Sequence, residues 1–247
     1  MTAVRESEPP AAGEARRRPG RARRALHTLS TILIVAGLLL LADAGLTVAW
    51  QEPLSALYAK VQQSRLNGRL DHAFSHVIAT PAEKRLLAAL PDDARRIAFA
   101  ARVYNRRATP GDAVGRIRIP RIGLERVIVE GTGTEDLRKG PGHYPATPMP
   151  GAPGTVGIAG HRTTYGAPFR HVDRLKAGDR IIVEMPYATV TYRVERLRIV
   201  APSATWVVDR RAFDRLVLTA CHPLYSAAER IVVFAREVAA KPTDRLR

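Results

Sequence analysis

The chain contains a single cysteine, Cys221, which ends the apolar run RLVLTAC and directly precedes a His-Pro pair. A lone cysteine cannot form an internal disulfide, and outside the cytoplasm a free thiol is open to oxidation. Such a cysteine is either packing material or a nucleophile. A cysteine nucleophile reacts as a thiolate and needs a neighbouring group that donates and accepts protons, most often a histidine. The histidines of the same region are therefore the candidates for that group.

Four histidines lie within the same stretch of chain: His143, His161, His171 and His222. His222 follows Cys221 directly, and neighbours on a strand point to opposite faces, so it is poorly placed as a partner. His171 lies in the helical pattern APFRHVDRL and His143 in the Gly/Pro-rich loop KGPGHYPAT. His161 ends the apolar run TVGIAG and opens the polar loop HRTTYGAPF. Two strand ends can meet at one rim of a barrel, which favours His161, although a satisfied loop histidine is the commoner role.

Arg230 begins the next apolar run, RIVVFA, after a connection that includes Pro223 and Ser226. If this strand pairs with the strand that ends at Cys221, Arg230 returns to the neighbourhood of the thiol. A guanidinium group there can hydrogen-bond the oxyanion of an acyl intermediate or orient a peptide backbone. The alternative is an exposed charge at a strand end.

The elements that must position these residues begin at Ala113, where short β-branched runs alternate with Gly, Pro and Asp turns. The clearest runs are VGRIRIP, ERVIVEG, TVGIAGH, DRIIVEM, ATVTYRVERLRIVAP, RLVLTAC and RIVVFAR. Many short strands bounded by turns, over roughly 125 residues, predict a β-barrel or a β-sandwich.

A helical pattern precedes the strands, and we interpret residues 51–110 as a helical stalk or linker. Thr80-Pro81 followed by Glu83 is typical of a helix start, and Pro91 with the two aspartates after it marks another.

The sequence contains no metal or cofactor motif, and we expect none. His72 and His76 lie one helical turn apart, but no third ligand accompanies them, so surface histidines are the better interpretation. Glu130, Glu135 and Asp136 are close in sequence, and a solvated loop explains them better than a calcium site.

The N-terminus is strongly basic and then strongly apolar. The formal net charge is +16, and arginines cluster between Arg16 and Arg24. The run Leu29–Trp50 carries one charge, Asp43, and would span about 33 Å as a helix, enough for a bilayer core. We therefore expect a disordered basic cytoplasmic tail (1–25) and a single transmembrane signal anchor (26–50), with the rest outside. A cleavable signal peptide, cut at the small residues Ala42–Ala44, is the alternative. Because the basic run adjoins the span, it is a topology signal and not a nucleic-acid site.

The segments GPGHYPAT, GIAGHRTTYGAPF and LTACHP…ERIVVFA, together with the N-terminal anchor, resemble a sortase, most closely the class E sortases of actinobacteria. Sortases are cysteine transpeptidases that attach proteins to the cell wall of Gram-positive bacteria. The order His161, Cys221, Arg230 matches the family, and the resemblance covers about Ala113 to Arg236. It implies a mainly β fold, a closed sortase-type eight-stranded β-barrel with short helices, over 111–240, followed by a C-terminal tail (241–247).

The resemblance also implies the reaction. Cys221 would cleave a C-terminal Leu-Ala-x-Thr-Gly or Leu-Pro-x-Thr-Gly sorting signal between Thr and Gly through a thioester, with His161 as general acid and base and Arg230 on the oxyanion. The implied partners are secreted proteins bearing that signal, an acceptor amine of a peptidoglycan precursor (lipid II) or a pilin lysine, and the cytoplasmic membrane, but no nucleic acid. The implied location is the cell membrane, with the catalytic domain extracellular.

The residues around the implied triad would bind the signal: Tyr144, Thr219, Ala220 and His222. Tyr144 would line the pocket for the second signal residue. The sequence departs from the usual family pattern at Val217 and Ala220, where threonines are expected. This departure keeps open an alternative, a degenerate and non-catalytic membrane-anchored binding or pilus-assembly module.

Two other cysteine acyl-transfer families fit less well. An L,D-transpeptidase places Ser-His-Gly before its cysteine, where this chain has Leu-Thr-Ala. Papain-like hydrolases place the cysteine before the histidine, the reverse of the order found here.

Overall fold

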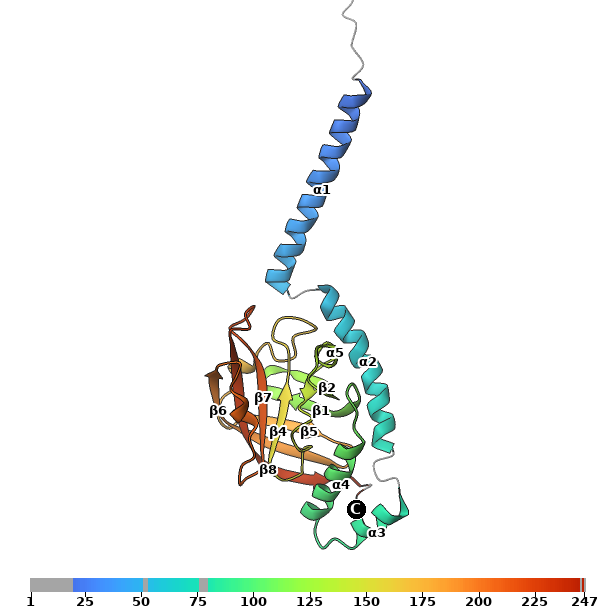
Figure 1. Cartoon of the computed structure of the whole chain (residues 1–247), viewed down its shortest axis with the longest axis vertical. Coiled ribbons are helices and arrows are strands. Elements are labelled where there is room, and N and C mark those ends of the chain that lie inside the picture. The colour runs from blue at the N-terminus through green and yellow to red at the C-terminus, as the bar shows by residue number, and fades with distance from the viewer. Residues whose placement is uncertain (1–19, 51–52, 76–79, 245, 247) are drawn as a thin grey trace, which may run out of the picture. The chain divides into compact units, whose positions relative to one another are not determined.

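Figure 1 shows the fold in a computed structural model, which describes residues 20–50, 53–75, 80–244 and 246. Most of the predicted basic tail, residues 1–19, and His76 of the histidine pair lie outside the described residues. The chain divides into two compact units, Met1–Val48 and Ala49–Arg247.

The first unit contains nearly all of helix α1, Arg21–Trp50. Its stretch Arg23–Gly45 has a mean hydropathy of 2.2 and is long and apolar enough to cross a membrane. Residues that are both apolar and exposed, such as Leu33 and Leu40, follow one another along this helix. Such a helix is compatible with lipid, because its exposed side chains are apolar and its backbone groups are already hydrogen-bonded within the helix. A signal sequence near the N-terminus has the same properties, so the feature fits both interpretations of the N-terminus.

The second unit is a closed β-barrel with the strand order β1-β2-β3-β4-β7-β8-β6-β5, which confirms the predicted fold class. Its strands are β1 (Ala113–Ile119), β2 (Leu124–Glu130), β3 (Gly142–His143), β4 (Thr155–Ala159), β5 (Arg180–Glu184), β6 (Ala188–Val200), β7 (Arg215–His222) and β8 (Glu229–Pro242). Most neighbours are antiparallel, but β2 with β3 and β4 with β7 run parallel, and Ala159 of β4 lies opposite Thr219 of β7. The C-terminal ends of strands β4 and β7 therefore lie at the same edge of the barrel.

Side-chain alternation along β7 separates the interior of the barrel from its outer face. Leu216, Leu218 and Ala220 belong to the main core. Val217 instead packs with Val232, Phe234 and residues of the short helix η3 (Thr205–Val208). Because successive strand residues point to opposite faces, Thr219 and Cys221 share the outer face with Val217.

In the described residues of the predicted stalk region, three helices precede the barrel: α2 (Pro53–Ser75), α3 (Pro81–Ala88) and α4 (Asp93–Arg107). The predicted helix starts are confirmed, since Thr80 and Glu83 form a capping box and Asp92 caps α4. Helix α4 contributes Ile97 and two alanines to the main core.

Helix α2 packs along β1 and β2, as Figure 1 shows, and is part of the second unit. Leu66 and Leu70 are buried with Ala113 and two valines of β2. The Gln63 side chain adds three hydrogen bonds: its Nε2 donates to the carbonyls of Val127 (3.1 Å) and Lys139 (2.8 Å), and its Oε1 accepts from the Val127 N–H (2.8 Å). These contacts fix α2 to the barrel wall.

Candidate active site

Cys221 and Arg230 lie directly opposite each other on the outer face of β7 and β8. The two strands are antiparallel, and Cys221 is the register partner of Arg230. Opposed residues of an antiparallel pair place their side chains on one face, with Cβ atoms about 4.5–5.5 Å apart. Cys221 is partly exposed, and Arg230 Nη1 donates to the carbonyls of Ala227 and Glu229, both at 2.9 Å. These bonds hold the guanidinium group against the turn that precedes β8, while the register pairing brings Arg230 opposite Cys221.

His161 reaches the same level from the parallel neighbour β4. The Gly160 N–H donates to the Thr219 carbonyl (3.0 Å), which continues the β4–β7 pairing to the residue before His161. The His161 carbonyl accepts from the Phe169 N–H (2.9 Å) and closes the loop 161–169. The last pair of this register is Ala159 with Thr219, and its continuation by two residues would bring His161 to the level of Cys221. The fold thus gathers the three predicted catalytic residues at one edge of the barrel.

The His161 imidazole is partly buried, and its Nε2 is shielded from solvent without a hydrogen-bond partner in the described residues. Burial lowers the pKa of His161 below its ordinary value, and the Arg138 cation lowers that pKa further. The protonated ring is then a stronger acid than an ordinary histidine, and the neutral ring is available as a base at neutral pH. An unpartnered nitrogen at this position is free to exchange a proton with a substrate amine.

Tyr144 lies over β4 and β7, and β7 is the strand that carries the thiol. Its hydroxyl is 2.8 Å from Thr219 Oγ1, two residues before Cys221 on the same face. A Cβ added to Gly157 would lie 2.7 Å from the Tyr144 ring and 3.2 Å from Val208. Gly157 is therefore the residue that lets Tyr144 and Val208 rest against β4. Tyr144 forms a wall of the outer face beside the predicted nucleophile.

The other predicted binding residues are distributed over both faces. Thr219 lies on the outer face and is held by Tyr144. The side chain of Ala220 belongs to the main core and points away from Cys221. Val217, the second departure from the family pattern, is fully buried on the outer face. His222 alternates away from Cys221, and its Nδ1 is 3.1 Å from Arg162 Nη1.

Arg162 is a residue that sequence reasoning missed. It directly follows His161, yet its side chain is 2% exposed. Its Nη1 contacts His222 Nδ1 (3.1 Å) and the Cys221 carbonyl (3.5 Å). Its Nη2 donates to the Arg170 carbonyl (3.2 Å) and pairs with Asp173 (3.1 Å). Because Arg162 donates, His222 Nδ1 accepts and the ring proton resides on Nε2. Arg162 ties the loop of the histidine to the strand of the cysteine.

Helix α2 also contacts the loop that carries His161. Ser55 Oγ accepts from the Tyr165 N–H (3.2 Å), and the rings of Tyr58 and Tyr165 meet edge to face at 6.2 Å. On its other side, Tyr165 lies 5.4 Å from the His161 ring. The Arg138 guanidinium sits 5.6 Å from the Tyr165 ring centre. The sequence placed α2 outside the β domain, so nothing in the helical pattern pointed to this contact.

Glu130 corrects one expectation, because it is not in a solvated loop. It is 4% exposed, and its carboxylate is 2.8 Å from Nδ1 of the buried His143. His143 Nε2 lies 3.2 Å from both the Pro148 carbonyl and Thr147 Oγ1, and Thr147 Oγ1 donates to the Tyr144 carbonyl (2.8 Å). This buried network fixes the loop from which Tyr144 projects.

Comparison with known proteins agrees with this geometry. A sortase domain family model matches residues 117–238. Sortase D of Bacillus subtilis (strain 168) is 33% identical over 132 residues, which is 52% of this chain and 65% of that protein. Sortase SrtE1 of Streptomyces coelicolor is 31% identical over 152 residues, 55% of this chain and 43% of that protein. The match thus spans less than two thirds of the length of either curated relative.

The solved structures show the same relationship over the barrel. The structure of sortase E from Streptomyces avermitilis is 32% identical, with a TM-score of 0.51, and the match covers 56% of this chain and 99% of that chain. The eight-stranded barrel, the thiol at the end of β7 and the matches of sequence and structure lead to one conclusion: the chain belongs to the sortase family.

Proposed function

We propose that this chain is a cysteine transpeptidase that cleaves a C-terminal sorting signal between Thr and Gly and transfers the protein to an amine. The observation that carries the proposal is the pairing of Cys221 with Arg230 across β7 and β8, at the level that the His161 segment reaches from β4. Nucleophile, proton carrier and fixed cation are the three groups that acyl transfer through a thioester requires.

The reaction follows from these positions. The Cys221 thiolate attacks the carbonyl carbon of the signal Thr, and Arg230 stabilises the resulting oxyanion. The C–N bond to Gly breaks as the protonated His161 donates its proton to the leaving nitrogen, leaving Thr bound to sulfur as a thioester. The incoming amine attacks the thioester carbon and gives a proton to His161, and sulfur leaves as the thiolate. Water in place of the amine gives hydrolysis.

The substrate and acceptor are proposed from the family and from Tyr144. The signal would be Leu-Ala-x-Thr-Gly or Leu-Pro-x-Thr-Gly, with the Tyr144 ring against its second residue. The acceptor would be the amine of a peptidoglycan precursor such as lipid II, or a pilin lysine. Thr219 supports this role of Tyr144 by holding its hydroxyl at 2.8 Å.

Helix α1 would anchor the enzyme at the cell membrane, with the arginine-rich N-terminus in the cytoplasm and the catalytic unit outside. Secreted substrates still tethered at the same membrane would then meet the enzyme at a raised effective concentration. The length and hydropathy of Arg23–Gly45 support the anchor.

The test uses the full chain in detergent micelles. It is incubated with Leu-Ala-x-Thr-Gly and Leu-Pro-x-Thr-Gly peptides plus triglycine as the amine, and products are identified by mass spectrometry. We expect cleavage between Thr and Gly and a transfer product, both lost in Cys221→Ala. Folded protein that cleaves neither peptide would favour the non-catalytic binding or assembly module instead.

A further inference from the structure

We propose that the cavity between the β3–β4 and β6–β7 connections is an upstream subsite that takes an acidic side chain of the substrate protein, one to three residues before the Leu of the sorting signal. This inference rests on the proposed function and names a feature of the substrate that lies outside the sorting motif.

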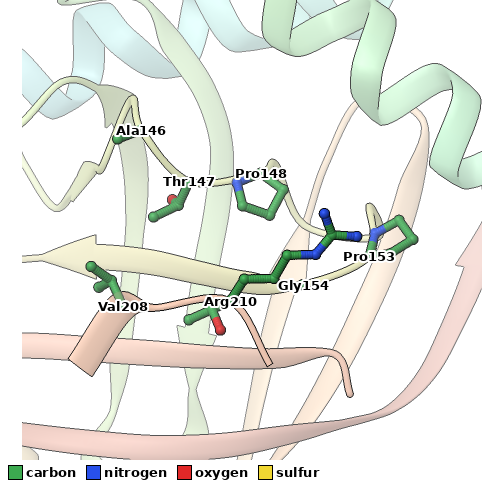
Figure 2. Close-up of a pocket in the computed structure, with 8 residues that line it drawn as sticks. Ala146, Thr147, Pro148, Pro153, Gly154, Val208 and Arg210 are labelled. Carbon is green, nitrogen blue, oxygen red and sulfur yellow. The ribbon is translucent and has the colours of Figure 1, made fainter. Parts of the chain in front are cut away.

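The cavity has a volume of about 290 Å³, which suits one or two side chains better than a cofactor. Figure 2 shows it bounded on one side by the connection after Tyr144 and on the other by the connection that follows η3. Its lining residues are Ala146, Thr147, Pro148, Pro153, Gly154, Thr155, Val208 and Arg210. Arg210 is the only charged residue in this set, so its charge dominates the cavity wall.

Arg210 is available for a ligand. Its side chain is exposed, and in Figure 2 it extends across the cavity, with its guanidinium group beside Pro153. Within residues 80–244 and the other described parts of the chain, Arg210 has no hydrogen-bond or ion-pair partner. The neighbouring Arg215 differs, because its guanidinium is buried and donates to Thr155 Oγ1 and to the Val207 and Asp209 carbonyls. An arginine without a partner presents a planar fork that matches a carboxylate.

The carboxylates that are close in sequence, Asp209 and Asp214, form no ion pair with Arg210 in the described residues. Asp214 accepts from the Gly154 N–H at 2.6 Å just before the start of β4, and it does not line the cavity. The adjacent Arg211 adds a second positive charge close by but does not line the cavity. Because Arg210, Arg211 and Arg215 outnumber Asp209 and Asp214 in this part of the chain, the local field favours an incoming acid over an incoming base.

The direction of the bound signal follows from the proposed chemistry. His161 must reach the leaving nitrogen, and it lies in the loop beyond the end of β4. The Gly side of the scissile bond therefore lies toward that loop. The residues before Thr then run the other way, back along β4 and β7 past Tyr144 and toward the cavity.

The strand register gives the distance. Gly157, which contacts Val208 and donates to Thr147 Oγ1 (3.1 Å), pairs with Val217, four residues before Cys221. Thr155 pairs with Arg215, six residues before Cys221. At about 3.3 Å per residue, the cavity lies roughly 13–20 Å from the thiol. An extended peptide with its Thr carbonyl at Cys221 would place there the residues four to six positions before Thr, which are one to three positions before Leu.

Binding is measured with the full-length Cys221→Ala protein in detergent micelles, so that the result does not depend on turnover. The probes are fluorescent Leu-Ala-x-Thr-Gly peptides with Glu, Lys or Ala at each of the three positions before Leu. We expect one position at which Glu binds about three- to tenfold more tightly than Lys, a preference that weakens at 0.5 M salt. In Arg210→Glu the preference should reverse. Arg211→Glu is the matched control, since it makes the same charge change outside the cavity.

Three results would overturn the subsite: equal binding of the Glu and Lys peptides, a preference that survives in Arg210→Glu, or an equal reversal in Arg211→Glu, which would indicate a general surface field. Cleavage of the Ala peptides by the unmodified chain is scored separately. Cleavage without a charge preference would refute the subsite and support the transpeptidase. A charge preference without cleavage would support the subsite and refute the transpeptidase.

Discussion

Replacing Arg162 by alanine should uncouple the loop of His161 from the strand of Cys221. The side chain is 2% exposed and bridges His222 Nδ1, the Arg170 carbonyl and Asp173 at 3.1–3.2 Å. Its loss leaves the partly buried His222 ring nitrogen and Arg170 carbonyl without their donor. Without the Arg162 contacts, the loop that carries His161 is no longer fixed to the strand that carries Cys221.

The size of the effect can be worked out from these contacts. A hydrogen bond from a charged donor contributes about 1.5–3 kcal/mol, and two of the lost bonds are to uncharged, partly buried acceptors. Asp173 is 48% exposed and is solvated by water in the variant, so the loss of its ion pair adds little to the destabilisation. We expect a loss of about 2–4 kcal/mol in the free energy of unfolding, or roughly 4–16 °C in Tm for a unit of this size. A misplacement of about 1 Å at the reacting atoms predicts a fall in kcat/KM of roughly 100-fold.

The assay measures thermal unfolding by tryptophan fluorescence and kcat/KM for peptide transfer on the same full-length preparation, well below the lowered Tm. Arg162→Lys should recover only part of both quantities, because an ammonium group cannot span the same acceptors. Arg174→Ala, an exposed arginine of the short helix after this loop, is the control and should change neither. A folded Arg162→Ala protein with kcat/KM within twofold of the parent would refute the positioning role.

Three further predictions test other contacts. Tyr58→Ala removes cover from the loop beside His161, so water reaches the ring and the pKa of His161, measured by NMR on labelled histidine, should rise toward its ordinary value. Gly157→Ala forces the Tyr144 ring away from β4 and should lower kcat/KM for the signal peptide by roughly tenfold, with a smaller effect on Tm. Burial raises the pKa of Glu237 to about 7, so the free energy of unfolding should decrease as the pH rises from about 4.5 to 7. Glu237→Gln should remove this part of the pH dependence.

The sign for Glu237 follows from its two protonation states. Below pH 4.5 the carboxyl is protonated in both the folded and the unfolded chain, and it contributes no pH dependence. As the pH rises, the unfolded chain ionises first, so the penalty grows and is complete above pH 7. Equal slopes in the parent and Glu237→Gln would contradict this assignment.

The other two predictions have their own controls. Leu57→Ala changes an exposed residue on the same helix as Tyr58 and should leave the pKa of His161 unchanged. An unchanged or lowered pKa in Tyr58→Ala would show that α2 does not shield the ring. Gly68→Ala adds the same methyl group in open space and without a positive φ, so it separates the substitution itself from the contact with Tyr144. Equal losses of activity in both glycine variants would remove the argument for a specific Tyr144 position.

The sequence predicted well what depends on local pattern. The strands after Ala113 follow from alternating β-branched runs, and the cap at Thr80 follows from residue types that satisfy free backbone donors. The meeting of the His161 and Cys221 segments was inferred from two strand ends, which the parallel pairing of β4 and β7 explains.

Contacts between distant segments were not predictable in the same way. Burial of Arg162 depends on four partners brought together by the closed barrel, and a charged residue in a polar loop is ordinarily exposed. Glu130 ends a strand whose alternation gave no sign that it would pair with His143. The seating of α2 on the barrel depends on Gln63, whose polar side chain would count toward the solvent face in any periodicity argument.

The most direct test of the central claim is the intact mass of the full-length protein mixed with a Leu-Ala-x-Thr-Gly peptide in the absence of an added amine. We predict an adduct equal to the peptide truncated after Thr, attached at Cys221, abolished in Cys221→Ala and discharged when triglycine is added. An unmodified mass in folded protein, or an adduct that persists in Cys221→Ala, would contradict the proposal that Cys221 is the nucleophile of a transpeptidase.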